Sequence, residues 1–394
     1  MKKVKIGLLG CIVIAIILGV AMGYVLPMPW VRLFVTFNGI FSQFLGFMIP
    51  LIIVGLVTPA IAEIGHGAGK MLLVTVAIAY IDTVVAGMLS YFTGAAFFPS
   101  LVSASTSGLA AMQKSAPIEP FFTVNIPAIL DVMSALVFSF IAGLGIAYGN
   151  LKTLKNASNE FKHIIEKSIE QAIIPLLPLY IFGIFLNMTV SGEAFRIISV
   201  FATIIVVIFA LHIFVLLYQY IIAGAIVKKN PFKLLWNMRS AYLTALGTSS
   251  SAATIPITLK QTVKNGVSEG VAGFTIPLCA TVHLSGSAMK ITACAFTIML
   301  LQGMEHSFPL FLHFVMILAI FMVAAPGVPG GAIMAALAPL SSILGFGAEE
   351  QALMIALYIA MDSFGTACNV TGDGAISLVV NRLFAKHKSE ADNS

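Results

Sequence analysis

The amino-acid sequence predicts an all-α polytopic membrane protein with eight transmembrane helices and two oppositely oriented re-entrant hairpins, arranged as inverted repeats. Three observations lead to this prediction. Only 9% of the 394 residues are charged and 59% are hydrophobic, which leaves too few charges to cover a water-soluble surface. Uncharged stretches of spanning length recur along the chain, and two late stretches are interrupted by Gly, Pro and Ser clusters. The composition excludes a soluble enzyme, a nucleic-acid-binding protein and a disordered chain.

A spanning helix needs about 20 apolar residues, and the first part of the chain offers six such segments. The first apolar run continues without charge from Ile6 to Val31, which is longer than the apolar region of a signal peptide. We therefore interpret it as a retained helix. The six expected spans are 1–31, 33–62, 69–95, 126–150, 168–190 and 194–227.

The basic residues predict the orientation of the chain. We expect two further segments, about 232–262 and about 305–346, to enter and leave the membrane on the same side. With a cytoplasmic N-terminus, 17 of the 21 Lys and Arg residues then lie inside, 3 lie outside, and Lys290 lies within the membrane. Because cytoplasmic loops are rich in Lys and Arg, we expect a multi-pass protein of a bacterial plasma membrane with both termini in the cytoplasm.

Both expected hairpins contain residues that interrupt helices. The first contains the triplet Ser249, Ser250 and Ser251, and the second contains Gly327-Val328-Pro329-Gly330. His283 follows Ser249 by 34 residues and Asp362 follows Pro329 by 33, so the two halves match in spacing. Such matched interruptions are the best sequence indication of a transporter's binding site, since irregular backbone in a membrane lines a cavity or is buried in protein.

Ionisable side chains within spans are candidates for function because they are costly to place there. Two carboxylates of the last span share one helix face, since Asp362, Thr366, Asn369 and Asp373 follow at i, i+4, i+7 and i+11. Buried carboxylates need cations nearby, which indicates metal ions or a substrate ammonium. Asp131, at the start of a span, is interpreted as interfacial. The ionisable residues of the expected spans are Asp82, Asp131, His283, Lys290, Asp362 and Asp373.

In the seventh span, His283, Ser287 and Lys290 are expected to share a helix face. Lys290 has three open interpretations: an ion pair with Asp82 or Asp362, a fixed cation in place of a bound one, or a proton-coupling group. His283 is either a satisfied polar residue of the core or a proton relay.

At these residues the sequence resembles the dicarboxylate/amino-acid:cation symporter family, and the resemblance covers nearly the whole chain. The run from Ser249 to Pro256 resembles the family's serine-rich first hairpin tip. Gly327-Val328-Pro329-Gly330 resembles the second tip, and Asn369-Val370-Thr371-Gly372-Asp373 resembles the signature of the last span.

The resemblance implies a homotrimer in the lipid bilayer, in which each protomer moves a transport domain against a scaffold by an elevator-type mechanism. The scaffold would contain residues 1–68 (helices 1 and 2) and 126–193 (helices 4 and 5). The transport domain would contain helix 3 with its external loop (69–125) and residues 194–386, which hold helices 6 to 8 and both hairpins. Residues 387–394 would form a cytoplasmic tail.

The resemblance also implies the residues of two sites. Asp362 would bind the substrate ammonium, while the first hairpin tip would hold the α-carboxylate and the second would close over it. The implied substrate-binding residues are Ser249, Ser250, Ser251, Val328, Gly331, Asp362, Gly365, Thr366 and Asn369. The implied or hypothesised sodium-site residues are Asp82, Thr83, Ser285, Asn369 and Asp373.

Three departures from the family pattern shape the prediction. Gly365 stands where acidic-substrate members carry an arginine, so we predict a neutral substrate. Ser285 stands where the seventh span usually has a sodium-binding aspartate, and Asp82 stands beside Thr83 where many members have two hydroxyl residues. We hypothesise that the carboxylate has moved from the seventh span to the third. Lys290 has no recognised counterpart, and it leaves the coupling ion open.

The predicted function is secondary active import of a small, neutral amino acid by symport with a cation, preferably sodium. The alternative is a proton-coupled carrier of amino acids or small carboxylates that uses Lys290 or His283. A passive channel is less favoured. We expect no enzymatic activity, no resident cofactor and no nucleic-acid partner, since no P-loop, dinucleotide or zinc motif is present.

Overall fold

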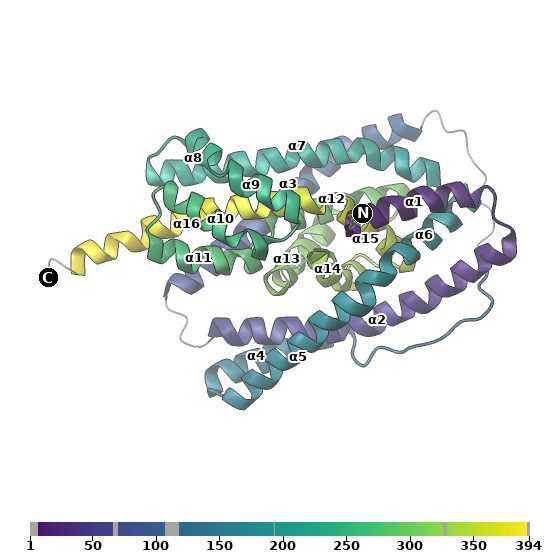
Figure 1. Ribbon diagram of the computed structural model, residues 1–394, viewed down its shortest axis with the longest axis horizontal. Helices are drawn as coiled ribbons and strands as arrows, with labels where there is room; N and C mark the ends of the chain where they lie inside the picture. The colour runs from purple at the N-terminus through teal and green to yellow at the C-terminus, as the bar shows by residue number, and fades with distance from the viewer. Residues whose placement is uncertain (1–6, 66–69, 107–117, 193, 326–328, 392–394) are drawn as a thin grey trace, which may run out of the picture.

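The computed structural model describes residues 7–65, 70–106, 118–192, 194–325 and 329–391, and every regular element within these ranges is a helix (Figure 1). Five of the described helices are long and apolar enough to cross a membrane, or six if one bent pair forms a single span. The predicted all-α polytopic class is therefore confirmed.

Five helices from the first half of the chain form a first helix group. Within it, α1 packs along α6, while α2 packs along α4, α5 and α6. The helix α5 continues through one widened turn at Ile169–Ile173 into α6. Asp131 caps the start of α4 by accepting a hydrogen bond from the Ser134 amide. The group comprises α1 (Leu8–Gly23), α2 (Met28–Gly65), α4 (Val132–Gly149), α5 (Lys152–Ser168) and α6 (Ile174–Val190).

The remaining helices form a second helix group around the last helix, α16 (Asp362–Ala391), drawn in yellow in Figure 1. The helix α16 packs against α7 (Ala194–Val227) and α11 (Glu269–Val282), and α3 (Lys70–Thr106) packs along α12 (Ser285–Gln302). The α12 helix also contacts α16. It is buried almost throughout, so its polar side chains are enclosed by protein.

The first expected hairpin consists of α9 (Arg239–Thr248) and α10 (Ser251–Lys264), which pack on each other after the short helix α8 (Pro231–Asn237). The chain reverses at Ser249, which has a left-handed backbone with φ 51°. Ser250 then caps α10, because its hydroxyl accepts a hydrogen bond from the Ala253 amide. The serine triplet thus ends one helix and starts the next.

The second expected hairpin consists of α13 (Phe308–Ala324) and α14 (Gly331–Ser342), which also pack on each other. At its tip, Gly330 has φ 76°, a left-handed conformation that glycine adopts without strain. Val328, a predicted substrate-binding residue, lies outside the described residues.

Two further helix breaks interrupt the late spans. The helix α11 ends at Val282, and α12 begins at Ser285 after two non-helical residues. The prediction that His283 shares a helix face with Ser287 and Lys290 was therefore wrong. The reason is that the first amides of α12 are bonded by a side chain of α16 instead of by the preceding helical turn. Farther along, α15 (Ala348–Ala360) meets α16 at an angle of 64°.

The contact between α1 and α6 generates a stability prediction. A Cβ added at Gly19 would lie 2.7 Å from the Phe182 carbonyl oxygen, whereas a Cβ at Gly46 would meet nothing within 4 Å. We expect Gly19→Ala to destabilise the protein by about 1–3 kcal/mol, because backbone must shift to admit the methyl group. Thermal unfolding in detergent should show a lower midpoint for Gly19→Ala than for the control Gly46→Ala. Equal midpoints would contradict the close contact.

Candidate functional site

An ion pair joins α12 to α16 in the interior of the second helix group. The Lys290 Nζ lies 3.3 Å from the Asp362 Oδ1. Lys290 is fully buried and Asp362 is 6% exposed. Of the two pairings that the sequence left open for Lys290, the structure shows the one with Asp362.

The second oxygen of Asp362 is bound as well. Its Oδ2 accepts a hydrogen bond of 3.0 Å from the Gly330 amide at the tip of the second hairpin. Thr366, one turn farther along α16, donates its hydroxyl hydrogen to the Asp362 carbonyl oxygen. Gly331, the first residue of α14, is buried next to this contact. A carboxylate, a hairpin tip and an ammonium group thus meet at the first turn of α16.

Asn369, about two helical turns after Asp362 on α16, holds the start of α12 in place. Its Oδ1 accepts hydrogen bonds from the amides of Gly286 at 2.8 Å and Ser287 at 3.3 Å. Its Nδ2 donates to the Ser287 hydroxyl at 3.1 Å, and that hydroxyl is also 3.0 Å from the Tyr358 hydroxyl. Asn369 is 2% exposed, so it satisfies amides that the helix break would otherwise leave unpaired in the interior.

The first hairpin tip reaches the same end of α16. The Ser249 hydroxyl lies 2.7 Å from the Ser363 hydroxyl, next to Asp362 in sequence. Ser251, the first residue of α10, is buried at 6% exposure. Both hairpin tips therefore contact the opening turn of α16, and the predicted substrate-binding residues Asp362, Gly365, Thr366 and Asn369 all lie near this end of the helix.

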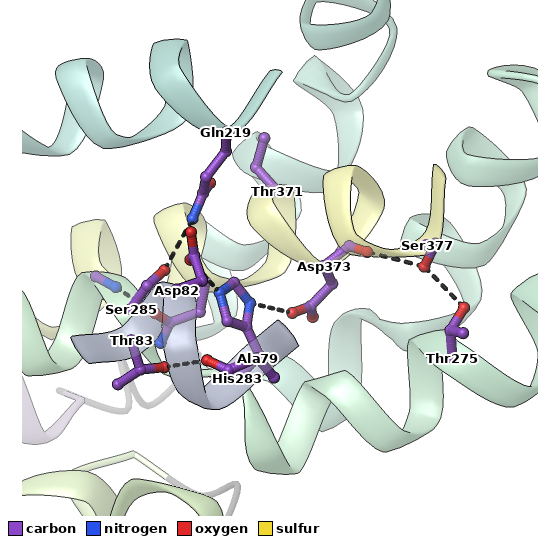
Figure 2. A network of polar contacts seen from close by, with 12 residues as sticks. Ala79, Asp82, Thr83, Gln219, Thr275, His283, Ser285, Thr371, Asp373 and Ser377 are labelled. Atoms are coloured by element: carbon purple, nitrogen blue, oxygen red, sulfur yellow. Dashed lines mark hydrogen bonds and ion pairs between the residues drawn. The ribbon is translucent and has the colours of Figure 1, made fainter. Parts of the chain in front are cut away.

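A second cluster of charges lies deeper along α16 (Figure 2). The His283 Nδ1 lies 2.9 Å from the Asp373 Oδ1, and its Nε2 lies 2.8 Å from the Asp82 Oδ2. The ring thus bridges α3 and α16 from the break between α11 and α12. Because an ionised carboxylate only accepts hydrogen bonds, the two contacts together need two protons shared among the three groups. This carboxylate–histidine cluster (Asp82, His283 and Asp373) then carries one net negative charge.

Residues of α7 complete the surroundings of Asp82. The Tyr218 hydroxyl donates to its Oδ1 at 2.7 Å, and the Gln219 Nε2 donates to its Oδ2 at 2.6 Å. The same Gln219 nitrogen lies 3.1 Å from the Ser285 hydroxyl. The Gln219 side-chain nitrogen therefore links Asp82 to Ser285. Ser285 is the position at which the family resemblance leads us to expect a carboxylate.

Two buried oxygens beside this cluster have no hydrogen-bond partner among the described residues, namely Gln219 Oε1 and Thr371 Oγ1. Figure 2 shows Gln219 and Thr371 next to each other at the edge of the cluster. In the described part of the chain, no group of three or more His, Cys, Asp or Glu side chains is arranged to hold a metal ion.

The remaining predicted residues take supporting positions. The Thr83 hydroxyl donates to the Ala79 carbonyl oxygen within α3. Gly365 lies against Lys290, and a Cβ there would be 2.7 Å from the Lys290 Nζ. The sequence pattern did not indicate Tyr218, Gln219 or Tyr358 as site residues. The available signal was the polar pair Tyr218 and Gln219 within an otherwise apolar span.

The fold and these buried charges define a class, that of multi-pass membrane transport proteins. The chain matches the model of the sodium:dicarboxylate symporter family over residues 8–383. The serine/threonine transporter SstT of Acinetobacter baumannii is 26% identical over 398 residues, covering 96% of this chain and 97% of that protein. Excitatory amino acid transporter 3 of Oryctolagus cuniculus is 30% identical over 271 residues, covering 67% of this chain and 51% of that protein.

The chain belongs to the sodium:dicarboxylate symporter family. The family and these relatives are transporters, so the protein is a membrane transporter and not an enzyme. The family's description implies that sodium is transported together with the substrate.

The carboxylate–histidine cluster generates a prediction of stability. His283→Ala leaves Asp82 and Asp373 without the ring that bonds both, so we expect it to destabilise the protein by about 3–5 kcal/mol. Adding Asp373→Asn should recover part of this loss, since it removes one of the unpaired charges. Denaturant titration of the purified protein in detergent measures both effects.

The matched control for this measurement is His313→Ala, which removes an exposed histidine of α13. It should leave the free energy of unfolding nearly unchanged. If His283→Ala were no more destabilising than His313→Ala, the ring would not be compensating the two carboxylates.

Proposed function

We propose that the protein is a sodium-coupled symporter that imports a small, neutral amino acid. It works in the plasma membrane as a homotrimer with cytoplasmic termini, and each protomer carries its own site. The observation that carries this proposal is the meeting of both hairpin tips at the first turn of α16, where Gly330 binds Asp362 and Ser249 contacts Ser363.

The chemistry of this meeting point suits an amino acid. A carboxylate at Asp362 suits an α-ammonium group. The start of α10 presents the positive end of a helix dipole at the serine tip, which suits an α-carboxylate. The names of two relatives, a serine/threonine transporter and an excitatory amino acid transporter, point to the same class of substrate.

Two features support a neutral substrate. Gly365 offers no side chain, and a side chain there would collide with the Lys290 ammonium, since its Cβ would lie 2.7 Å from Nζ. Lys290 itself is engaged with Asp362 and is fully buried. Its ammonium is also bound by the carbonyl oxygens of Met361 and Tyr358. A substrate with an acidic side chain would therefore lack a cationic partner that is not already bound by protein oxygens, and an uncompensated buried charge is strongly unfavourable.

The carboxylate–histidine cluster supports a coupling role for Asp82. This residue and Ser285 bind the same Gln219 nitrogen, which fits a carboxylate moved from the seventh span to the third. Two unpartnered oxygens, of Gln219 and Thr371, lie at its edge. Hard oxygen ligands of this kind are used by transporters to bind sodium. The bridging imidazole is the one feature that favours proton coupling as the alternative.

The division into two helix groups supports an elevator-type mechanism. Every site residue described above lies in α3, in α7 or in the part of the chain from α9 onward, and none lies in the first helix group. The two groups contact each other mainly through α13, α14 and α15. The second helix group would move as the transport domain, and the first would remain as the scaffold.

Uptake into proteoliposomes tests the proposed substrate and ion together. With an inward sodium gradient, labelled serine or alanine should accumulate above its external concentration. A proton gradient in sodium-free buffer should drive no accumulation. High-affinity aspartate uptake that excess serine does not inhibit would contradict a neutral substrate, and proton-driven uptake would establish the alternative.

The role of Asp82 has its own test. Asp82→Ser removes the carboxylate, so we expect the sodium concentration for half-maximal uptake to rise by about tenfold to a hundredfold, the loss of one charged ligand contact. Glu269→Gln removes an exposed carboxylate from the first turn of α11 and is the matched control. Normal sodium dependence in Asp82→Ser would refute the relocated carboxylate.

A further inference from the structure

Lys290 is paired with Asp362, the carboxylate that the ammonium of the substrate would need. We propose that Lys290 is a built-in counter-ion of Asp362, which the α-ammonium of the substrate displaces on binding and which returns when the substrate leaves. This inference rests on the proposed function, since it assumes that Asp362 binds an amino group.

The surroundings of Lys290 are those of a cation. Besides Asp362, its Nζ lies 3.3 Å from the Met361 carbonyl oxygen and 3.5 Å from the Tyr358 carbonyl oxygen. It also lies 3.5 Å from the centroid of the Tyr358 ring. Carboxylate, carbonyl and aromatic face all attract positive charge. The carbonyls lie at the C-terminal end of α15, where the helix dipole is negative and the chain bends towards α16.

The geometry also fits a contact that can be exchanged. The Lys290–Asp362 distance of 3.3 Å is longer than the 2.7–2.9 Å typical of strong charge-assisted hydrogen bonds. Asp362 keeps a second bond, to the Gly330 amide of the second hairpin tip, that does not involve Lys290. The carbonyls of Tyr358 and Met361 would remain as partners for the ammonium after Asp362 is taken. Gly365 makes this placement feasible, since any side chain there would collide with Nζ.

The exchange has a consequence for the transport cycle. A symporter must return its empty site across the membrane, and an unpaired carboxylate in the interior makes that step costly. With Lys290 bound, the empty site carries a neutral pair. An amino acid carries one ammonium and one carboxylate, so its net charge is zero. The net charge of the site therefore does not change when the ammonium of the substrate takes the place of Lys290 beside Asp362. Lys290 therefore acts on the return of the empty carrier more than on the binding of the substrate.

Comparison of net uptake with exchange tests the proposal. Lys290→Met keeps most of the length of the side chain and removes its charge. In proteoliposomes without internal substrate, net serine or alanine uptake should fall by about a hundredfold, the effect of an uncompensated buried charge. In proteoliposomes loaded with the same amino acid, exchange needs no empty return, so its rate should stay close to that of the unmodified protein.

Two variants complete this experiment. Lys290→Arg keeps the positive charge and should recover part of the net uptake. Lys260→Met removes an exposed lysine from α10 and should change neither rate. Equal loss of net uptake and exchange in folded Lys290→Met would overturn the proposal, and so would an unchanged net uptake.

A second measurement needs no variant, and so does not depend on the folding of Lys290→Met. A 2-hydroxy acid such as lactate matches alanine in shape but has no ammonium to displace Lys290. The proposal predicts that lactate in large excess does not inhibit alanine uptake by the unmodified protein. Inhibition by lactate as strong as by unlabelled alanine would show that Asp362 never changes its partner, and would overturn the proposal.

The two proposals fail in distinguishable ways. If the unmodified protein shows neither uptake nor exchange of any amino acid, the proposed function is wrong. If it transports an amino acid but Lys290→Met shows no difference between net uptake and exchange, only the role of Lys290 is wrong.

Discussion

The arrangement of the second helix group depends on the cost of burying charge away from water. Three carboxylates, Asp82, Asp362 and Asp373, lie in its interior, and each contacts a basic side chain supplied by the segment from His283 to Lys290. A buried carboxylate without such a partner is destabilising by several kcal/mol. The packing of α3 and α16 around α12 is therefore fixed by charge pairing as well as by apolar contact.

Breaks in the helices make this pairing possible. His283 reaches two carboxylates because the chain is not helical at the junction of α11 and α12, and Asn369 satisfies the amides that the break exposes. The bend between α15 and α16 turns the carbonyls of Tyr358 and Met361 towards Lys290. Ser249 and Gly330 let the hairpin tips reach the same turn of α16. In a membrane, irregular backbone is tolerated only in such enclosed positions.

Much of this arrangement follows from local sequence. The long stretches without charged residues identified the helical membrane class, and the Gly, Pro and Ser clusters indicated both hairpins. Helical spacing placed Asp362 and Asn369 on one helix. The break at His283 could not be predicted in this way, because its cause is a set of partners on α3 and α16 that are distant in sequence. For the same reason, the sequence left open whether Lys290 pairs with Asp82 or Asp362. Tyr218 and Gln219 gain their roles only once α7 lies beside α3.

The central claim is that the interior charges of the carrier exchange partners when substrate binds. A structure determined by cryo-electron microscopy with bound serine or alanine in sodium tests it most directly. We predict that the amino group of the substrate lies within hydrogen-bond distance of Asp362, and that the Lys290 ammonium has moved away from that carboxylate towards the carbonyls of Tyr358 and Met361. An intact Lys290–Asp362 pair with the substrate bound elsewhere would contradict it.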